Sequence, residues 1–172
     1  MTRRDPLTPE MKWQVTSRLV TSLPLMYDIT FRDVVGDRYD TLEQQIWVHL
    51  AREAKALAGS ASLPTRDARD LMETLRVILG VFFGPDLRTE EVAISPERAV
   101  LMIKRCPFLF CERESRSGSE HLLSRCLSFS IATVEALNPA YTLRFVRSMC
   151  TGDRTCELKI MKREDAEKDD SR

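Results

Sequence analysis

The spacing of apolar residues changes at about residue 90, and this change limits the folds that the chain can adopt. Earlier in the chain, apolar residues recur at steps of three and four, as at Ile46, Leu50 and Ala54, which is the period of a helix. Later they alternate with polar residues, as at Leu158 and Ile160, which is the period of a strand. The sequence therefore predicts an α+β fold, with a helical N-terminal half followed by a small antiparallel sheet of about four strands and one inserted helix.

Helices are expected over residues 8–84. Pro9 at a first helical position and Gly36 after a last turn are typical boundaries, and Pro24 is expected to interrupt the first helix. The expected helices cover residues 9–23, 25–35, 39–58 and 64–83. The helix at 39–58 has the clearest apolar stripe, which predicts one buried face.

The sheet-containing part is expected over residues 90–162. Residues 151–154 have the composition of a turn between two alternating segments, which predicts a hairpin. The expected elements are strands at 92–95, 99–103, 140–149 and 155–161, and a helix at 122–137. Because residues 163–172 are almost wholly polar, they are predicted to form a disordered tail, so that a single domain spans residues 1–162.

The composition is that of one domain with a buried core. Its 172 residues are 43% hydrophobic, and 26 Lys and Arg balance 26 Asp and Glu. This balance disfavours a nucleic-acid partner, and no apolar run is long enough for a membrane helix. The first residues lack the apolar stretch of a secretory signal, so we expect a cytoplasmic protein. The helical half is the part expected to dock on a partner subunit or a second copy of the chain.

All five cysteines lie in the C-terminal part of the chain. Cys106 follows a predicted strand, Cys126 lies near the start of the inserted helix, and Cys156 opens the last strand. These three are expected to meet at one end of the sheet as ligands of zinc or an iron–sulfur cluster, with Cys111 as the fourth ligand. Cys150 is expected on the opposite strand face. The alternative is that the cysteines are small buried hydrophobic residues, since the chain has no Cys-x-x-Cys pair.

Four further residues are expected to support the site or shape turns rather than to react. His121 precedes the inserted helix, near Cys126 in sequence, where it is either structural or a ligand or base. Asn138 lies between the inserted helix and a strand. Gly152 and Asp153 are typical of a turn.

A series of short motifs runs through residues 98–161. They are Cys106-Pro107, Cys126, Ala136-Leu137-Asn138-Pro139 and Gly152-Asp153-Arg154-Thr155-Cys156-Glu157-Leu158. In this order they resemble the L-2-amino-thiazoline-4-carboxylic acid hydrolase-like superfamily and, more distantly, the V4R-type small-molecule-binding domains. The chain differs from these families in having Leu127-Ser128 after the middle cysteine, where an acidic pair is often seen, and Ser148 where the V4R-type pattern has a cysteine.

The resemblance implies an α+β domain with a ligand or metal pocket near Cys106, Cys126 and Cys156. Three hypotheses follow. The first is a cysteine-ligated metal or iron–sulfur domain with an adjoining pocket for a small organic ligand. The second is a hydrolase of a small cyclic substrate, in which a cysteine or a metal-bound water attacks a C–N bond. The third is a non-catalytic ligand-sensing or accessory subunit whose helical half docks on a partner.

Overall fold

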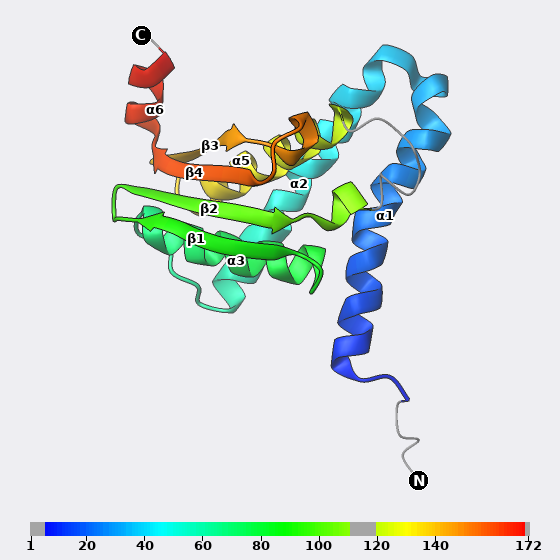
Figure 1. Ribbon diagram of the computed structural model, residues 1–172, viewed down its shortest axis with the longest axis horizontal. Coiled ribbons are helices and arrows are strands. Elements are labelled where there is room, and N and C mark those ends of the chain that lie inside the picture. Colours follow the sequence, from blue (N-terminus) through cyan, green and yellow to red (C-terminus); the bar gives the residue numbers. More distant parts are fainter. Residues whose placement is uncertain (1–5, 111–119, 171–172) are drawn as a thin grey trace.

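Helices fill the N-terminal half of the chain in this computed structural model, which describes residues 6–110 and 120–170 (Figure 1). The helices are α1 (Pro9–Val35), the short 3-10 helix η1 (Gly36–Arg38), α2 (Tyr39–Ser60) and α3 (Ala68–Phe83). Side chains cap two of them: Thr8 accepts a hydrogen bond from the Met11 amide, and Asp67 accepts one from the Asp70 amide. The predicted helical half is thereby confirmed.

Pro24 does not interrupt the first helix, contrary to the prediction. A single helix, α1, runs through it. Proline inside a helix removes one hydrogen bond and costs on the order of 3 kcal/mol. Buried residues hold the helix on both sides of that point, with Ser17 and Thr21 before it and Leu25 and Asp28 after it. Tertiary contacts therefore keep both halves of α1 on one helix.

The second half of the chain forms a four-stranded antiparallel sheet with the order β1-β2-β4-β3. The strands are β1 (Arg88–Ile94), β2 (Arg98–Arg105), β3 (Tyr141–Arg147) and β4 (Cys156–Lys162), and helix α5 (Glu120–Leu137) lies between β2 and β3 in sequence. The hairpin between β3 and β4 contains the 3-10 helix η2 (Met149–Thr151), and Gly152 follows it with a φ of 101°. This arrangement confirms the predicted fold class.

Helices α3 and α5 cover one face of the sheet, and α2 packs beside them (Figure 1). The alternation in the strands turns Leu101, Leu143 and Leu158 toward these helices, and all three are buried. Leu101 lies opposite Leu158 in the β2–β4 ladder, so the two strands contribute to one apolar layer. The core lies between the sheet and the helices.

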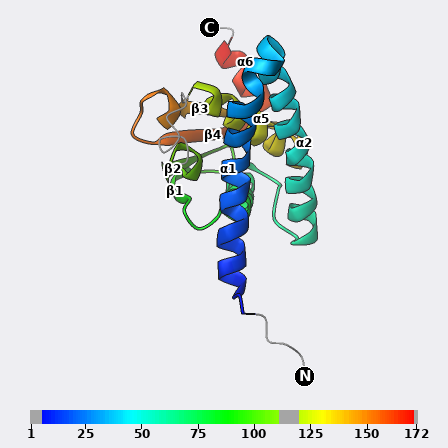
Figure 2. The same ribbon diagram turned by 90° about the vertical axis from the view of Figure 1, so that its right-hand side faces the viewer.

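Helix α1 lies to one side of this body, and its N-terminal end projects beyond it (Figures 1 and 2). It is held where it crosses the end of α3. The Trp13 indole Nε1–H donates to the Val81 carbonyl at 3.1 Å. Ser17 lies so close to Gly84 that a side chain at position 84 would overlap the serine hydroxyl. Small residues thus set the approach of α1 to the domain.

Residues 163–170 form helix α6 (Arg163–Asp170), where the polar composition predicts a disordered tail. The Ala166 side chain is buried, and its carbonyl accepts a hydrogen bond from Arg144 Nη2 at 2.6 Å. The amide of Arg163 donates to the carbonyl of Ala140. These contacts with the β3 region anchor the polar segment, and a sequence pattern without an apolar stripe does not reveal them.

Candidate functional site

A small, partly enclosed cavity of about 30 Å³ lies next to the β3–β4 hairpin and the beginning of α5. Most of its wall is apolar and aromatic, and four of its rings, those of Trp47, Phe83, Phe108 and Phe129, pack against one another. The rings meet edge to face: the Phe83 and Phe108 centroids are 4.8 Å apart, and those of Trp47 and Phe108 are 5.8 Å apart. The remaining lining residues are Leu79, Leu87, Ile103, Cys106, Pro107, Arg125, Cys126, Ser130, Phe145, Ser148, Met149, Cys150, Cys156 and Leu158.

The four cysteines that the structure describes all line this cavity. Cys106 directly follows β2, Cys126 belongs to α5, and Cys156 is the first residue of β4. Cys150 lines the cavity too, so the expectation that it turns away to the opposite face is wrong. The reason is that residues 149–151 form η2 rather than continuing the strand, and the alternation stops there. Cys111 lies outside the described residues.

The cavity raises the pKa of two of these thiols. Burial, followed by the neighbouring Cys106, Cys150 and Cys156, raises the pKa of Cys126 well above its ordinary value. Burial also raises the pKa of Cys156, although the Met149 amide donates to its Sγ at 3.3 Å. Because only the thiolate is a strong nucleophile or metal ligand, both thiols are poorly prepared for either role in this arrangement.

Within residues 6–110 and 120–170, no group of three or more His, Cys, Asp and Glu side chains is placed to hold a metal ion. The cysteines surround the cavity without forming such a group. The zinc or iron–sulfur site expected at Cys106, Cys126 and Cys156, with Cys111 as fourth ligand, therefore stays a prediction.

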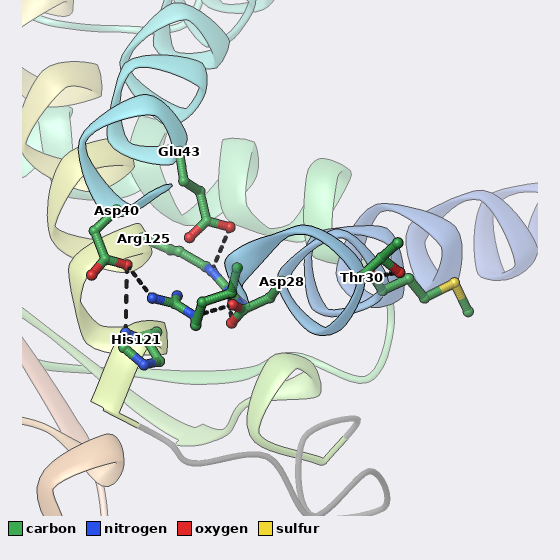
Figure 3. A network of polar contacts seen from close by, with 8 residues as sticks. Asp28, Thr30, Asp40, Glu43, His121 and Arg125 are labelled. Atoms are coloured by element: carbon green, nitrogen blue, oxygen red, sulfur yellow. Dashed lines mark hydrogen bonds and ion pairs between the residues drawn. The ribbon is translucent and has the colours of Figure 1, made fainter. Parts of the chain in front are cut away.

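The charged side chain in the cavity wall is Arg125, and it belongs to a buried ionic network between α1, α2 and α5 (Figure 3). Its Nη2 donates to Asp28 Oδ2 at 2.6 Å, and its Nε lies 2.8 Å from Glu43 Oε1. The second contact is an ion pair without a well-aligned hydrogen bond. All three side chains are buried, so the arginine charge is compensated inside the protein.

The two carboxylates of this network respond differently to burial. Burial acts to raise the pKa of Asp28, but the hydrogen bond from Arg32 and the charge of Arg125 hold that pKa below its ordinary value. For Glu43, burial is the larger effect and raises the pKa despite the attraction of Arg125. Of the two carboxylates, Asp28 is therefore the one whose charged form is favoured, and it is the stronger ion-pair partner for Arg32 and Arg125.

His121 lies at the edge of the network and not at the cavity. Its Nδ1 is 3.5 Å from Asp40 Oδ1, and Asp40 also accepts a hydrogen bond from Arg32 Nη1 at 2.9 Å (Figure 3). His121 is absent from the cavity lining. Its contacts are those of a residue that holds α5 against α2.

Asn138 and Asp153 make the contacts of turn residues. The Asn138 side chain donates to the Thr65 carbonyl at 2.9 Å and accepts from the Ala140 amide at 3.1 Å. Asp153 accepts from the Ser148 amide at 2.9 Å, beside the left-handed Gly152. These contacts lie in the connections before β3 and β4, so they position the strands that carry the cavity wall.

The Asp28–Arg125–Glu43 network is not predicted from the sequence. A signal was present: Arg125 stands between Leu122 and Phe129 at helical spacing, on the buried side of α5. A charged residue on an apolar helix face requires a buried partner. The partners come from helices that lie far away in sequence, and the sequence pattern alone does not identify them.

Neither a protein-family model nor a curated protein sequence matches the chain. Solved structures do match in fold. The phenol-responsive sensory domain of the transcription activator PoxR, solved with phenol, has a TM-score of 0.55 at 11% identity, over 86% of this chain and 75% of that chain. Trafficking protein particle complex subunit 3 from Naegleria fowleri, covalently bound to palmitic acid, has a TM-score of 0.53 at 11% identity, over 87% of this chain and 96% of that chain.

Similarity at 11% identity shows a shared α+β fold. The resemblance to the thiazoline-carboxylate hydrolase-like superfamily stays a prediction. In the described part of the chain, the helices are too short or too polar to cross a membrane.

Proposed function

We propose that this protein is a non-catalytic, small-molecule-binding domain of the sensing or accessory kind, and that the cysteine-lined cavity is its ligand site. The observation that carries the proposal is the cavity wall itself, in which aromatic rings and cysteine side chains surround one space between the sheet and helices α2, α3 and α5. Ligand sites typically combine such an apolar wall with a few polar groups that set orientation. Here those groups are Ser130, Ser148 and Arg125.

The wall favours an apolar or aromatic ligand. A new aromatic ring inside the cavity would meet the edges and faces of Phe83, Phe108 and Phe129, which is a favourable environment for stacking. The arginine in the wall is already compensated by Asp28 and Glu43, so it does not require an anionic ligand. Two solved structures with this fold hold phenol and palmitic acid, which supports a ligand of this class.

The ligand must enlarge the cavity in order to bind. A volume of about 30 Å³ is well below the ~300 Å³ at which ordinary ligand sites begin. Met149 offers the simplest way to open it, because its side chain is only partly buried and methionine adapts readily to new shapes. We therefore expect binding to select a more open arrangement of the η2 side of the wall.

The same wall argues for binding rather than hydrolysis. Among the described residues, the cavity lining holds no Asp, Glu or His. A cysteine nucleophile needs a base or a lowered pKa, whereas the pKa values of Cys126 and Cys156 are raised. A C–N hydrolase acting through these cysteines lacks both requirements.

Cysteine ligation of zinc or of an iron–sulfur cluster is the second candidate. It is favoured by one observation, that four cysteines from separate elements line one cavity. It requires the sulfurs to move together, because they do not form a metal-binding group as they stand within the described residues. Metal analysis and an absorption spectrum of anaerobically purified protein test it separately from ligand binding.

A pair of variants tests the ligand site. Ser130 lines the cavity, whereas Ser128 lies two residues away on α5 and faces a surface hollow. Phenol and decanoic acid are titrated separately against the wild type, Ser130→Phe and Ser128→Phe, and the change in melting temperature is recorded. A ligand at 100 times its Kd stabilises the fold by about 2.7 kcal/mol, which is a shift of several degrees for a domain of this size.

We expect at least one of the two compounds to stabilise the wild type and Ser128→Phe, and neither to stabilise Ser130→Phe. Using the shift on adding ligand avoids confusion with any destabilisation by the added ring. Equal shifts in both variants would place the ligand elsewhere. A stoichiometric metal in the wild type that is lost in Cys126→Ser and Cys156→Ser would favour the second candidate.

A further inference from the structure

Helix α1 buries polar residues and exposes apolar ones. Of its four buried residues, Ser17, Thr21 and Asp28 are polar or charged. Its large apolar side chains are exposed instead, for example Ile29 at 60% and Val34 at 82%. The exposed set is Met11, Trp13, Val15, Leu19, Leu23, Met26, Tyr27, Ile29, Phe31, Val34 and Val35. An amphipathic helix of a self-contained domain shows the reverse pattern.

The exposed apolar surface of α1 is also depleted of charge. Between Leu19 and Phe31, Asp28 is the single acidic or basic residue, and its carboxylate is buried against Arg125. Loss of charge from the centre of a surface, with aromatic residues and methionines in its place, is the composition that marks protein interfaces.

An open groove of about 740 Å³ runs between α1 and α2 and continues this surface. We call it the α1–α2 groove. Its α1 side is formed by Val20, Leu23, Pro24, Tyr27, Phe31 and Val35. Its α2 side is formed by Tyr39, Leu42, Glu43, Ile46, Trp47, His49, Leu50 and Glu53. The same chain therefore carries both an apolar groove and an apolar helix of the kind that fills such grooves.

We propose that a second copy of this chain covers the exposed face of α1 and the α1–α2 groove, so that the protein is a symmetric dimer through its helical half. This proposal does not rest on the ligand cavity. A two-fold dimer needs one surface that is complementary to itself, and a groove beside an apolar helix meets that condition.

The area is sufficient for a stable dimer. Large side chains present roughly 150–250 Å² each, and the exposed ones on α1 average about half of that, so α1 offers on the order of 1,000 Å². Stable interfaces bury about 800 Å² per partner, whereas the largest apolar patch on a typical monomer is about 300–600 Å². The surface of α1 exceeds what a monomer ordinarily exposes.

The charges of α1 favour a protein partner over a lipid surface. Lys12, Arg18 and Arg32 are balanced by Glu10, Asp28 and Asp33, so the helix carries no net charge. Helices that lie on anionic membranes are rich in Lys and Arg on their polar face. This balance leaves α1 without the electrostatic attraction that such binding uses.

Sedimentation equilibrium of the full chain between about 1 and 100 µM tests the proposal. The wild type is expected to be a dimer. Tyr27→Glu and Ile46→Lys place charges on the two sides of the groove, at side chains that are 52% and 65% exposed, and each is expected to weaken the dimer at least 100-fold. Val146→Glu is the matched control, because Val146 is 58% exposed on β3, away from the helical half.

Circular dichroism and melting of the variants at low concentration establish that each is folded before association is compared. A wild type that is monomeric at 100 µM overturns the proposal, and so does a dimer that neither Tyr27→Glu nor Ile46→Lys weakens. Co-sedimentation with vesicles containing phosphatidylserine is the second arm. Binding of a monomeric wild type to those vesicles assigns the surface to lipid instead.

Discussion

Helices α1 and α3 are both rich in large apolar residues, but they use them in opposite ways. In α3, Leu71, Leu75 and Ile78 are fully buried and belong to the core between this helix and the sheet. In α1, Leu19 and Ile29 are more than half exposed, while Ser17 and Thr21 face the domain. The apolar residues of α3 stabilise the fold of a single chain, whereas those of α1 are available to something outside it.

Two features connect the cavity with the α1–α2 groove. Trp47 lines both, so its side chain separates one from the other. The Arg125 network crosses the same boundary, because Arg125 lines the cavity and its partner Glu43 lines the groove. The body of the domain and helix α1 are expected to respond differently to mutation.

The largest effect is expected at the ionic junction. Arg125→Met removes the shared partner of Asp28 and Glu43 and leaves two buried carboxylates without it, which is expected to lower the free energy of unfolding by about 3–5 kcal/mol. Arg76→Met is the control, since its ion pair with Glu91 at 3.3 Å lies at the surface and is worth about 0–1 kcal/mol. Urea unfolding measures both, and similar losses in the two variants would contradict a structural role for the buried network.

The second-largest effect is expected from truncating apolar side chains, which should cost much more stability in α3 than in α1. Leu75→Ala in α3 removes a fully buried side chain and is expected to cost about 3 kcal/mol. Leu19→Ala in α1 removes a side chain that is 53% exposed, and its effect on the unfolding of the monomer is expected to be within about 0.5 kcal/mol. Urea midpoints are recorded at several protein concentrations, so that any effect on association is separated. Equal costs at low concentration would show that α1 belongs to the core.

The turn residues are expected to give the smallest effect. Asn138→Ala and Asp153→Ala each remove side-chain contacts to backbone groups in a connection, and each is expected to lower stability by about 1 kcal/mol. The shift in melting temperature on adding ligand is expected to stay as in the wild type. Full stability combined with a complete loss of ligand binding would instead place these residues in the site.

The helices and strands could be predicted from the sequence, but the exposure of the apolar side chains of α1 could not. The period change near residue 90, the hairpin around Gly152 and the inserted helix are local patterns, and the structure confirms them. Helix α1 continues through Pro24, and α6 packs against the domain through Ala166. Both depend on tertiary contacts, which override local preference. Periodicity shows that a helix has an apolar face, but it does not show whether that face meets the chain's own core.

The candidate site was predictable in part for a similar reason. Placing Cys126 and Cys156 near one end of the sheet follows from strand ends and helix starts. The position of Cys150 was predicted wrongly because η2 ends the alternation. The aromatic rings and Arg125 reach the cavity from helices that come together only in the folded chain.

The most direct test of the ligand site uses isoleucine methyl groups as reporters of the two hollows. Ile103 lines the cavity and Ile46 lines the α1–α2 groove. The protein is labelled at isoleucine δ1-methyl groups and titrated with phenol and with decanoic acid while two-dimensional methyl NMR spectra are recorded. We predict a saturable shift of the Ile103 signal with at least one compound and an unchanged Ile46 signal. A saturable shift at Ile46 with Ile103 unchanged, or no saturable shift at either, would contradict the assignment of the cavity as the ligand site.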